Sequence, residues 1–335
     1  MKKSVLLTGA SGTVGFEVLK QLIENDKYDV TVFDVQSKNS QKKFLSLPQT
    51  FKNVYGDLTN PIDVEKVTGN KDYVIHLAAI IPPLADEKPA LAEKVNVKGT
   101  ELLLENLEKH SPDAFFVYSS SISVYGDRLN TPEIKIDDPL IPSEGDEYAV
   151  TKIKTEKIIQ NSRLRWSIFR LAAIMGNHKI SKLMFHMPLK TSVEICTPED
   201  TARAFVYALE HQNELQGRIF NLGGGEKCRL TYEELLSESF RIFGMGKLDF
   251  PQKAFAEKNF HCGNYADGED LERILKFRKD DLKTYFKKVE SGVNPTVKAL
   301  TKLVNPLVKK SLLKKSEPFH AYKHQDKKLT ERFFN

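Results

Sequence analysis

The chain has 335 residues, of which 40% are apolar and 28% are charged, with a formal net charge of +5. This length and apolar content are enough to bury a full hydrophobic core, which excludes a disordered or fibrous chain. Residues 287–335 hold twelve Lys and Arg against four Asp and Glu, which leaves the rest of the chain at −3, and such a mildly acidic body argues against a nucleic-acid-binding protein.

The beginning of the chain predicts a cytoplasmic protein. Met1, Lys2 and Lys3 lead directly into an apolar run that is too short for a signal peptide. No stretch reaches membrane-spanning length. The three cysteines are far apart and form no C-x-x-C pair, so we expect neither a disulfide framework nor a metal site.

Short β-rich runs alternate with helical patterns through the first 120 residues. Strands are predicted at 4–8, 30–34, 73–78 and 115–119, with helices at 14–23, 64–67 and 90–109. Later residues continue the alternation, with helices at 148–160, 198–210 and 231–243 and strands at 167–171 and 218–222. The pattern predicts a doubly wound parallel sheet of the Rossmann type, in the α/β class. The loop at 126–148 is long enough to be functional or mobile.

A glycine-rich turn connects the first predicted strand to the first predicted helix. Gly9, Gly12 and Gly15 form G-x-x-G-x-x-G, which lets the backbone turn tightly and approach a pyrophosphate at the helix N-terminus. Candidate cofactor-binding residues in this turn are Gly9, Ser11, Gly12, Thr13, Val14 and Gly15. Asp34 ends the second strand, where a carboxylate can bond both ribose hydroxyls and repel a 2′-phosphate. This favours NAD, and the nearby Lys38 keeps NADP as the minor alternative.

Tyr148 and Lys152 lie one helical turn apart on the same face of a predicted helix. About one such Tyr-x-x-x-Lys pair is expected by chance in this composition, so the motif alone does not indicate a catalytic pair. The evidence lies in where the pair stands along the chain. The helix follows the fourth strong strand, and that strand ends in three serines, Ser119 to Ser121.

The chain resembles the NAD-dependent epimerase/dehydratase family of extended short-chain dehydrogenase/reductases. The resemblance covers about residues 3–245 and rests on an ordered set of motifs: the glycine turn, Asp34, 56–59, 76–79, Asn96, 118–126, Tyr148 to Lys152 with Glu156, 170–176, 197–200 and 220–224. It implies an enzyme that uses NAD and moves a hydride at a carbinol or ketone carbon.

The resemblance also assigns roles to individual residues. Tyr148 is the implied acid and base, and Lys152 favours its phenolate form and forms a hydrogen bond with the nicotinamide ribose. Ser121 is implied to hold the substrate oxygen, with Ser119 and Ser120 as the alternatives. The further implied cofactor contacts are Asp57, Leu58, Leu77, Ala78, Ala79, Asn96 and Ser119. His76 is interpreted as a core histidine, Asn96 also as a helix-packing residue, and Asp200 as a structural brace.

Two departures from the family pattern concern the substrate. Residues 171–176 lack the usual Asn-Pro, and only 24 positions separate Gly176 from Asp200, where nucleotide-sugar epimerases carry a longer lobe. We therefore expect a sugar-like or small hydroxylated substrate. His178, Lys179, Lys182 and His186 are candidate contacts to an anionic group, although a solvated loop explains them equally well.

The tail from Asn294 predicts a basic amphipathic helix that is kinked at Pro306. It either packs on its own domain or a second subunit, the favoured interpretation, or lies on an anionic membrane surface. The predicted organisation is an NAD-binding Rossmann domain at 1–175, a small substrate lobe at 176–290 and this tail at 291–335.

Several functions stay open at this point. An epimerase re-reduces its own product, a net dehydrogenase or reductase exchanges cofactor at each turnover, and a non-catalytic NAD(P)-binding regulator can use the same fold. The resemblance further implies a homodimer.

Overall fold

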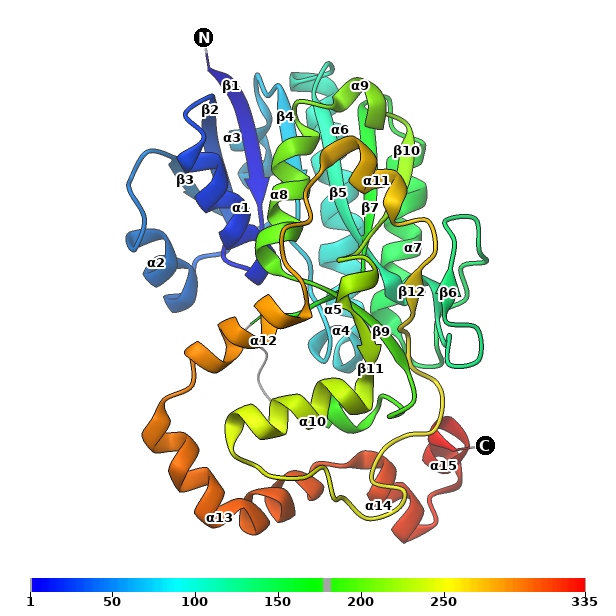
Figure 1. The fold of residues 1–335 in the computed structure, drawn as a ribbon. Helices are drawn as coiled ribbons and strands as arrows, with labels where there is room; N and C mark the ends of the chain where they lie inside the picture. Colours follow the sequence, from blue (N-terminus) through cyan, green and yellow to red (C-terminus); the bar gives the residue numbers. More distant parts are fainter. Residues whose placement is uncertain (1, 177–181, 335) are drawn as a thin grey trace.

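A seven-stranded parallel sheet forms the centre of the computed structural model, which describes residues 2–176 and 182–334 (Figure 1). The strand order is β10-β7-β5-β4-β1-β2-β3, and every neighbouring pair is parallel. The strands are β1 (Lys3–Thr8), β2 (Tyr28–Asp34), β3 (Lys52–Tyr55), β4 (Tyr73–His76), β5 (Phe115–Ser121), β7 (Arg165–Leu171) and β10 (Arg218–Leu222). The predicted doubly wound α/β fold is confirmed.

Helices cover both faces of this sheet. On one face, α1 (Thr13–Glu24), α8 (Pro198–Ala208) and α11 (Glu269–Leu275) share a hydrophobic core with Val5 and Leu7 of β1. On the other face, α3 (Pro61–Thr68), α6 (Gly99–His110) and α7 (Glu147–Gln160) share a second core with Leu6. Consecutive side chains of β1 thus enter opposite layers of core, which explains why Val5, Leu6 and Leu7 are all apolar.

Shorter elements connect these layers. They are α2 (Lys38–Leu45), α4 (Leu84–Glu87), α5 (Pro89–Ala92), the π-helical turn η1 (Glu93–Lys98), the 3-10 turn η2 (Ile122–Tyr125), α9 (Gln212–Leu215) and the paired strands β6 (Glu133–Ile134) and β12 (Asn264–Tyr265). The predicted helix at 90–109 is therefore three consecutive helical segments with a π-helical turn in the middle.

A smaller lobe lies beyond the carboxyl ends of the central strands. Its sheet is β8 (Ala173–Ile174), β9 (Ser192–Cys196) and β11 (Arg229–Thr231), accompanied by η3 (Lys182–Phe185), η4 (Glu226–Cys228) and α10 (Tyr232–Phe243). Its core is separate from both layers of the central sheet and includes Phe185, Phe240 and Phe255. The lobe therefore stands where a parallel sheet offers its ligand-binding edge.

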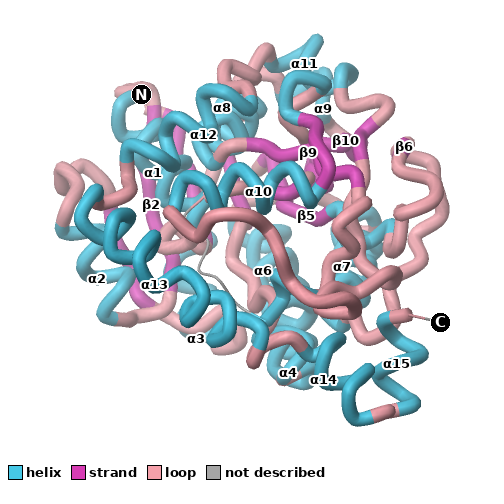
Figure 2. Tube along the Cα trace, turned by 60° about the horizontal axis from the view of Figure 1, so that its bottom comes forward, coloured by secondary structure: helices cyan, strands magenta, loops and turns pink. Residues whose placement is uncertain are grey.

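Four helices complete the chain at this same end of the molecule. They are α12 (Leu282–Ser291), α13 (Pro295–Leu313), α14 (Glu317–His324) and α15 (Lys327–Phe333). Viewed with this end forward, α10, α13 and α14 stand in front of the sheet (Figure 2). Tyr285 of α12 and Leu312 of α13 are buried in the core of the lobe, so the tail is part of the lobe.

Candidate active site

The glycine-rich turn lies at the carboxyl end of β1, where the backbone passes close to the end of β4. Gly9 has a φ of +72°, and a Cβ atom on it would stand 2.6 Å from the backbone nitrogen of Ala78. A Cβ atom on Gly15 would stand 2.1 Å from the carbonyl oxygen of Gly9. Glycine is therefore required at both positions, one for its conformation and both for space.

The first turn of α1 presents free backbone N–H groups beside this turn. Gly12 is the N-cap residue, and no side chain caps the helix there. Asp34, buried at the end of β2, accepts hydrogen bonds from the N–H of Ser11 at 2.7 Å and of Val35 at 2.7 Å. An uncapped helix N-terminus and a fixed carboxylate thus stand on two sides of the same turn.

Lys43 of α2 is part of this region although the sequence did not single it out. Its Nζ donates to the carbonyl oxygen of Ser11 at 2.9 Å and lies 5.0 Å from the ring centroid of Phe16. Partial burial lowers its pKa, which Glu17 and Asp34 partly counteract. Lys38 is exposed at the start of α2. The only local signal for Lys43 was its place on a short basic helix.

Asp57 and Leu58 follow β3. The Asp57 carboxylate accepts from the N–H of Thr59 at 2.8 Å, and its own N–H donates to Asp63 at 3.2 Å. Leu58 is buried and packs under Gly99. These bonds fix the segment at the carboxyl edge of the sheet beside β2.

The segment after β4 contains Leu77, Ala78 and Ala79, all partly buried. Asn96 of η1 braces it and links it to α7: its amide pairs with both the N–H and the carbonyl of Ile80, at 2.7 and 2.9 Å, and donates to the hydroxyl of Thr151 on α7 at 3.0 Å. These bonds agree with the interpretation of Asn96 as a packing residue.

His76 is a core histidine. It is fully buried and bonded to the hydroxyls of Thr8, at 2.7 Å, and Thr100, at 2.9 Å. Burial, assisted by the positive charge of Lys152, lowers its pKa to about 3. Because the neutral ring is hydrogen-bonded at both nitrogens, neither nitrogen is free for catalysis, in agreement with the sequence interpretation.

The three serines at the end of β5 have different surroundings. Ser119 donates to the carbonyl oxygen of His76 at 3.4 Å, and the Ser120 hydroxyl donates to the buried carboxylate of Glu156. Both are buried, whereas Ser121 is only partly buried. Ser121 accepts from the N–H of Ser123 at 3.2 Å and stands close enough to Tyr148 to affect the pKa of the phenol. Among the three, Ser121 is the one that stands beside Tyr148.

Tyr148 extends from the first turn of α7 toward Ser121. Its side chain keeps some accessible surface, but protein atoms surround the phenol closely. This burial raises the pKa of the phenol well above its usual range, and the charge of Asp146 adds to the effect. The neighbouring Ser121 hydroxyl acts in the opposite direction and lowers this pKa. In these surroundings the protonated phenol is the stable form at neutral pH.

Lys152 lies beneath Tyr148 and is almost fully buried. Its Nζ donates to the carbonyl oxygen of Ser119 at 2.6 Å and to the Tyr118 hydroxyl at 3.0 Å, and lies 5.5 Å from the Tyr148 ring centroid. Burial lowers the pKa of this ammonium to about 7, although Glu156 counteracts the effect. At neutral pH much of the population is uncharged, so the expected lowering of the Tyr148 pKa by Lys152 is outweighed here by burial of the phenol.

Contacts from distant parts of the sequence hold α7 in position. Asp146 is the N-cap residue and accepts from the N–H of Ala149 at 2.9 Å, while Asp86 accepts from the N–H of Tyr148 at 3.3 Å. Further along the helix, Glu156 pairs with the buried Arg170 of β7 at 2.7 Å. The sequence analysis singled out neither Asp146 nor Asp86.

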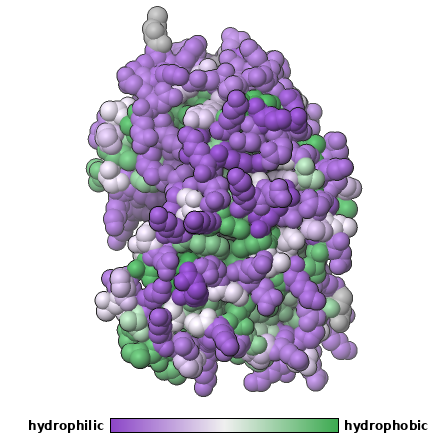
Figure 3. Space-filling view, in the orientation of Figure 1, coloured by the Kyte–Doolittle hydropathy of each residue, from purple (hydrophilic) through white to green (hydrophobic). Residues whose placement is uncertain are grey.

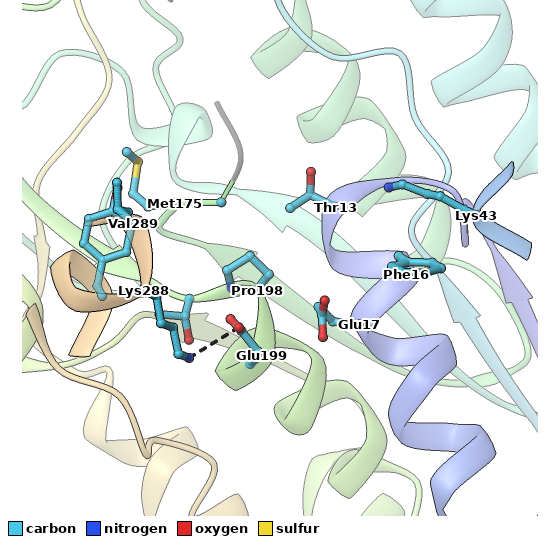
Figure 4. Close-up of a pocket in the computed structure, with 12 residues that line it drawn as sticks. Thr13, Phe16, Glu17, Lys43, Met175, Pro198, Glu199, Lys288 and Val289 are labelled. Atoms are coloured by element: carbon cyan, nitrogen blue, oxygen red, sulfur yellow. Dashed lines mark ion pairs between the residues drawn. The ribbon is translucent and has the colours of Figure 1, made fainter. Parts of the chain in front are cut away.

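Two cavities adjoin this region. The larger, about 490 Å³, lies between α1 and the walls formed by α8 and α12, and Figure 4 shows Lys43 and Phe16 on one side with Lys288 and Glu199 on the other. Thr13, at the glycine turn, borders it. The smaller, about 130 Å³, lies beside the start of α7 and is lined in part by Asp86, Asp146, His261 and Arg332.

The remaining predicted residues lie in the smaller lobe. His178 and Lys179 fall outside the described residues, and Lys182 begins η3. His186 lines the small cavity and contacts Glu317 at 2.9 Å. Asp200 is buried and accepts from the N–H groups of Lys279 and Asp280, both at 2.9 Å, which agrees with its interpretation as a brace.

The residues at the carboxyl edge of the sheet fit a dinucleotide. The turn has no room for side chains at Gly9 and Gly15, the N-terminus of α1 has no side-chain cap, and Asp34 ends β2. These features suit a pyrophosphate and the adjoining ribose. Ser121, Tyr148 and Lys152 stand at the same edge, at the end of β5.

Comparisons with known proteins agree with this geometry. A model of the NAD dependent epimerase/dehydratase family matches residues 5–223. The decarboxylating sterol-4-alpha-carboxylate 3-dehydrogenase of Saccharomyces cerevisiae is 30% identical over 163 residues, which are 47% of this chain and 45% of that protein. An uncharacterized UDP-glucose epimerase of Bacillus subtilis is 25% identical over 256 residues, which are 67% of this chain and 78% of that protein. The chain spans about half the length of the sterol dehydrogenases that it matches.

Solved structures share the fold. The UDP-glucuronic acid 4-epimerase of Bacillus cereus, in complex with UDP-glucuronic acid and NAD, superposes with a TM-score of 0.72 at 23% identity, covering 89% of this chain and 99% of that one.

Proposed function

We propose that this chain, which belongs to the NAD dependent epimerase/dehydratase family, is an NAD-dependent oxidoreductase acting at a carbinol or ketone carbon. Its substrate is a sugar-like or small hydroxylated molecule. Tyr148 is the acid and base, Ser121 holds the substrate oxygen and Lys152 supports both.

The observation that carries this proposal is the arrangement at the end of β5. At the partly open end of the strand, Ser121 stands close enough to Tyr148 to lower the pKa of the phenol, while the Ser119 and Ser120 hydroxyls donate inward to His76 and Glu156. Lys152 fixes the backbone of Ser119 from below. This gives one donor and one proton-transferring phenol that can reach the same substrate oxygen.

Bound NAD would supply a hydride acceptor at C4 of its nicotinamide ring. In the oxidative direction, Tyr148 first releases its own phenolic proton to solvent, and the phenolate oxygen then takes the proton of the substrate hydroxyl while Ser121 holds the same oxygen. In the reductive direction Tyr148 returns that proton to the carbonyl oxygen. Burial holds the pKa of Tyr148 high, so the phenol carries its proton at neutral pH and can donate it. Because reduction of a carbonyl consumes a proton, we expect a lower pH to favour reduction over oxidation.

The sequence between the central sheet and α8 supports a compact substrate. Only 24 positions lie between Gly176 and Asp200, which agrees with the absence of a large nucleotide-holding insertion there.

The cofactor state of the purified protein is the first experiment. Heat-released ligand is identified by mass spectrometry, and the protein is then assayed with NAD against compact polyols, hydroxy acids, sugars and UDP-sugars. NAD that co-purifies and is not exchanged supports an epimerase, whereas weak, exchangeable NAD with net reduction supports a dehydrogenase. Failure to retain or bind any NAD contradicts the proposal.

The preference for NAD over NADP is assigned to Asp34. Titration of the wild type should show tighter binding of NAD by at least tenfold, because the carboxylate repels a 2′-phosphate. Asp34→Ala should weaken NAD binding and remove most of this preference. An unchanged preference in the variant would contradict the role of Asp34.

A further inference from the structure

Helix α13 is attached to the smaller lobe by one face only. Leu312 is buried in the core of the lobe, with Val308 and Leu313 packed against it. The carbonyl oxygen of Lys298 lies close against Gly244 at the end of α10. Lys298 pairs with Glu290 at 3.1 Å, and Lys309 pairs with Asp249. The inner face of the helix is therefore held by both apolar and ionic contacts.

The opposite face of α13 presents a row of large apolar side chains to solvent. Val297, Leu300, Leu303 and Leu307 are 58%, 60%, 81% and 69% exposed. Spacings of three, three and four residues place them on one side of the helix. Figure 3 shows hydrophobic residues gathered over the part of the surface where Figure 1 places α13. We call these four residues the outer row.

Lysines without ion pairs accompany the outer row. Lys310, Lys314 and Lys315 are exposed, and none of them has an ion pair among the described residues. Beyond the kink at Val304, a rotation of 100° per residue places Lys310 and Lys314 beside Leu307 on the helix surface. The outer face therefore combines an apolar row with excess positive charge.

We propose that α13 docks this outer face on an anionic lipid surface. Outward apolar side chains beside unpaired lysines match the interfacial region of a bilayer, where leucines enter the acyl boundary and ammonium groups meet lipid phosphates. Within the described residues, no helix has the length and apolar content needed to cross a membrane. The contact is therefore peripheral.

The charges argue against a second copy of this chain as the occupant. A two-fold contact through the outer row would bring the same lysines from both copies together, which costs free energy without acidic partners. The acidic groups Glu290 and Asp249 lie on the inner side of α13 and are already paired with Lys298 and Lys309. An anionic bilayer neutralises the unpaired lysines directly.

Flotation of the full-length protein with vesicles tests the proposal. We expect binding to phosphatidylcholine mixed with phosphatidylglycerol, and little binding to phosphatidylcholine alone or at high salt. Replacing Leu300, Leu303 and Leu307 by Gln should reduce the partition coefficient at least tenfold. Replacing Lys310, Lys314 and Lys315 by Gln should reduce it about a hundredfold, because each lysine near the surface contributes about fivefold.

Matched controls use exposed residues elsewhere. Leu45→Gln, in which an equally exposed leucine of α2 is changed, and the pair Lys327→Gln and Lys328→Gln on α15 should leave vesicle binding within twofold. Circular dichroism and NAD affinity verify that each variant is folded. Absence of wild-type binding to anionic vesicles, or equal losses in the control variants, overturns the proposal. So does a dimer that the leucine changes convert to monomer without any change in vesicle binding.

Discussion

Lys152 is the residue whose burial has the clearest thermodynamic consequence. Its pKa in the folded protein is about 7, against 10.5 for an ordinary lysine. Between these values the unfolded chain binds more protons, so this residue makes stability rise with pH across that window. Below pH 7 the burial penalty is fully present.

We therefore predict that Lys152→Met raises the free energy of unfolding relative to the wild type most strongly below pH 7. The removed penalty is on the order of 3–5 kcal/mol there, less the cost of the two lost hydrogen bonds. The gain should shrink steadily toward pH 10.5. Chemical denaturation across this range provides the measurement, with Lys154→Met, an exposed lysine on the same helix, as the control. A difference that does not vary with pH would contradict the shifted pKa.

Ser120 and Ser121 differ by one position and should respond oppositely to truncation. Ser121→Ala should lower kcat/KM by about tenfold to a hundredfold with little loss of stability, because its hydroxyl is assigned to the substrate oxygen. Ser120→Ala should cost about 1–3 kcal/mol of stability, since it removes a donor from the buried Glu156 carboxylate. Steady-state kinetics and denaturation on both variants decide the assignment. The reverse pattern would make Ser120 the functional serine.

Tyr148, Lys152 and Ser121 could be predicted because they lie in short motifs, at a strand end and the start of a helix. The resemblance to the family assigned their roles and selected Ser121 among the three serines. Lys43 and Asp86 were not predicted, because each reaches the site through a contact between segments far apart in sequence. Only the fold brings them there.

At the scale of elements, the strongly apolar strands and periodic helices were predicted, including the edge strand β10, whereas the other edge strand, β3, was missed. β3 has four residues, none of them fully buried, so it lacks a strand signal of its own. The kink predicted at Pro306 is confirmed, with non-helical backbone at Val304. This position lies within the turn where proline removes a hydrogen bond and clashes with the preceding backbone.

The glycine-rich turn supports a prediction about this connection between β1 and α1. Gly15→Ala should weaken NAD binding by more than about a hundredfold, because its Cβ would stand 2.1 Å from a backbone oxygen and must displace the turn. Gly69→Ala, where a Cβ meets nothing within 4 Å, serves as the control. NAD titration of both variants makes the comparison. Equal affinities would show that the turn does not hold the cofactor.

At the scale of the whole molecule, the site depends on the meeting of the parallel sheet and the smaller lobe. The sheet supplies the glycine-rich turn and the serines, and the lobe with its C-terminal helices closes the space beyond the strand ends. The sequence predicted a separate tail at 291–335, but the course of that tail over the lobe depends on contacts such as Leu312 with the core, which no local pattern encodes.

The most direct test of the account pairs two measurements on Tyr148→Phe. With the substrate that the NAD-linked assay identifies, we expect turnover to fall by at least about a thousandfold, because the variant has no proton to transfer. The dissociation constant for NAD should change by less than about threefold, because the ring remains and only a hydroxyl is lost. Turnover that persists in this variant, with NAD still bound, would contradict the assignment of Tyr148 as the acid and base.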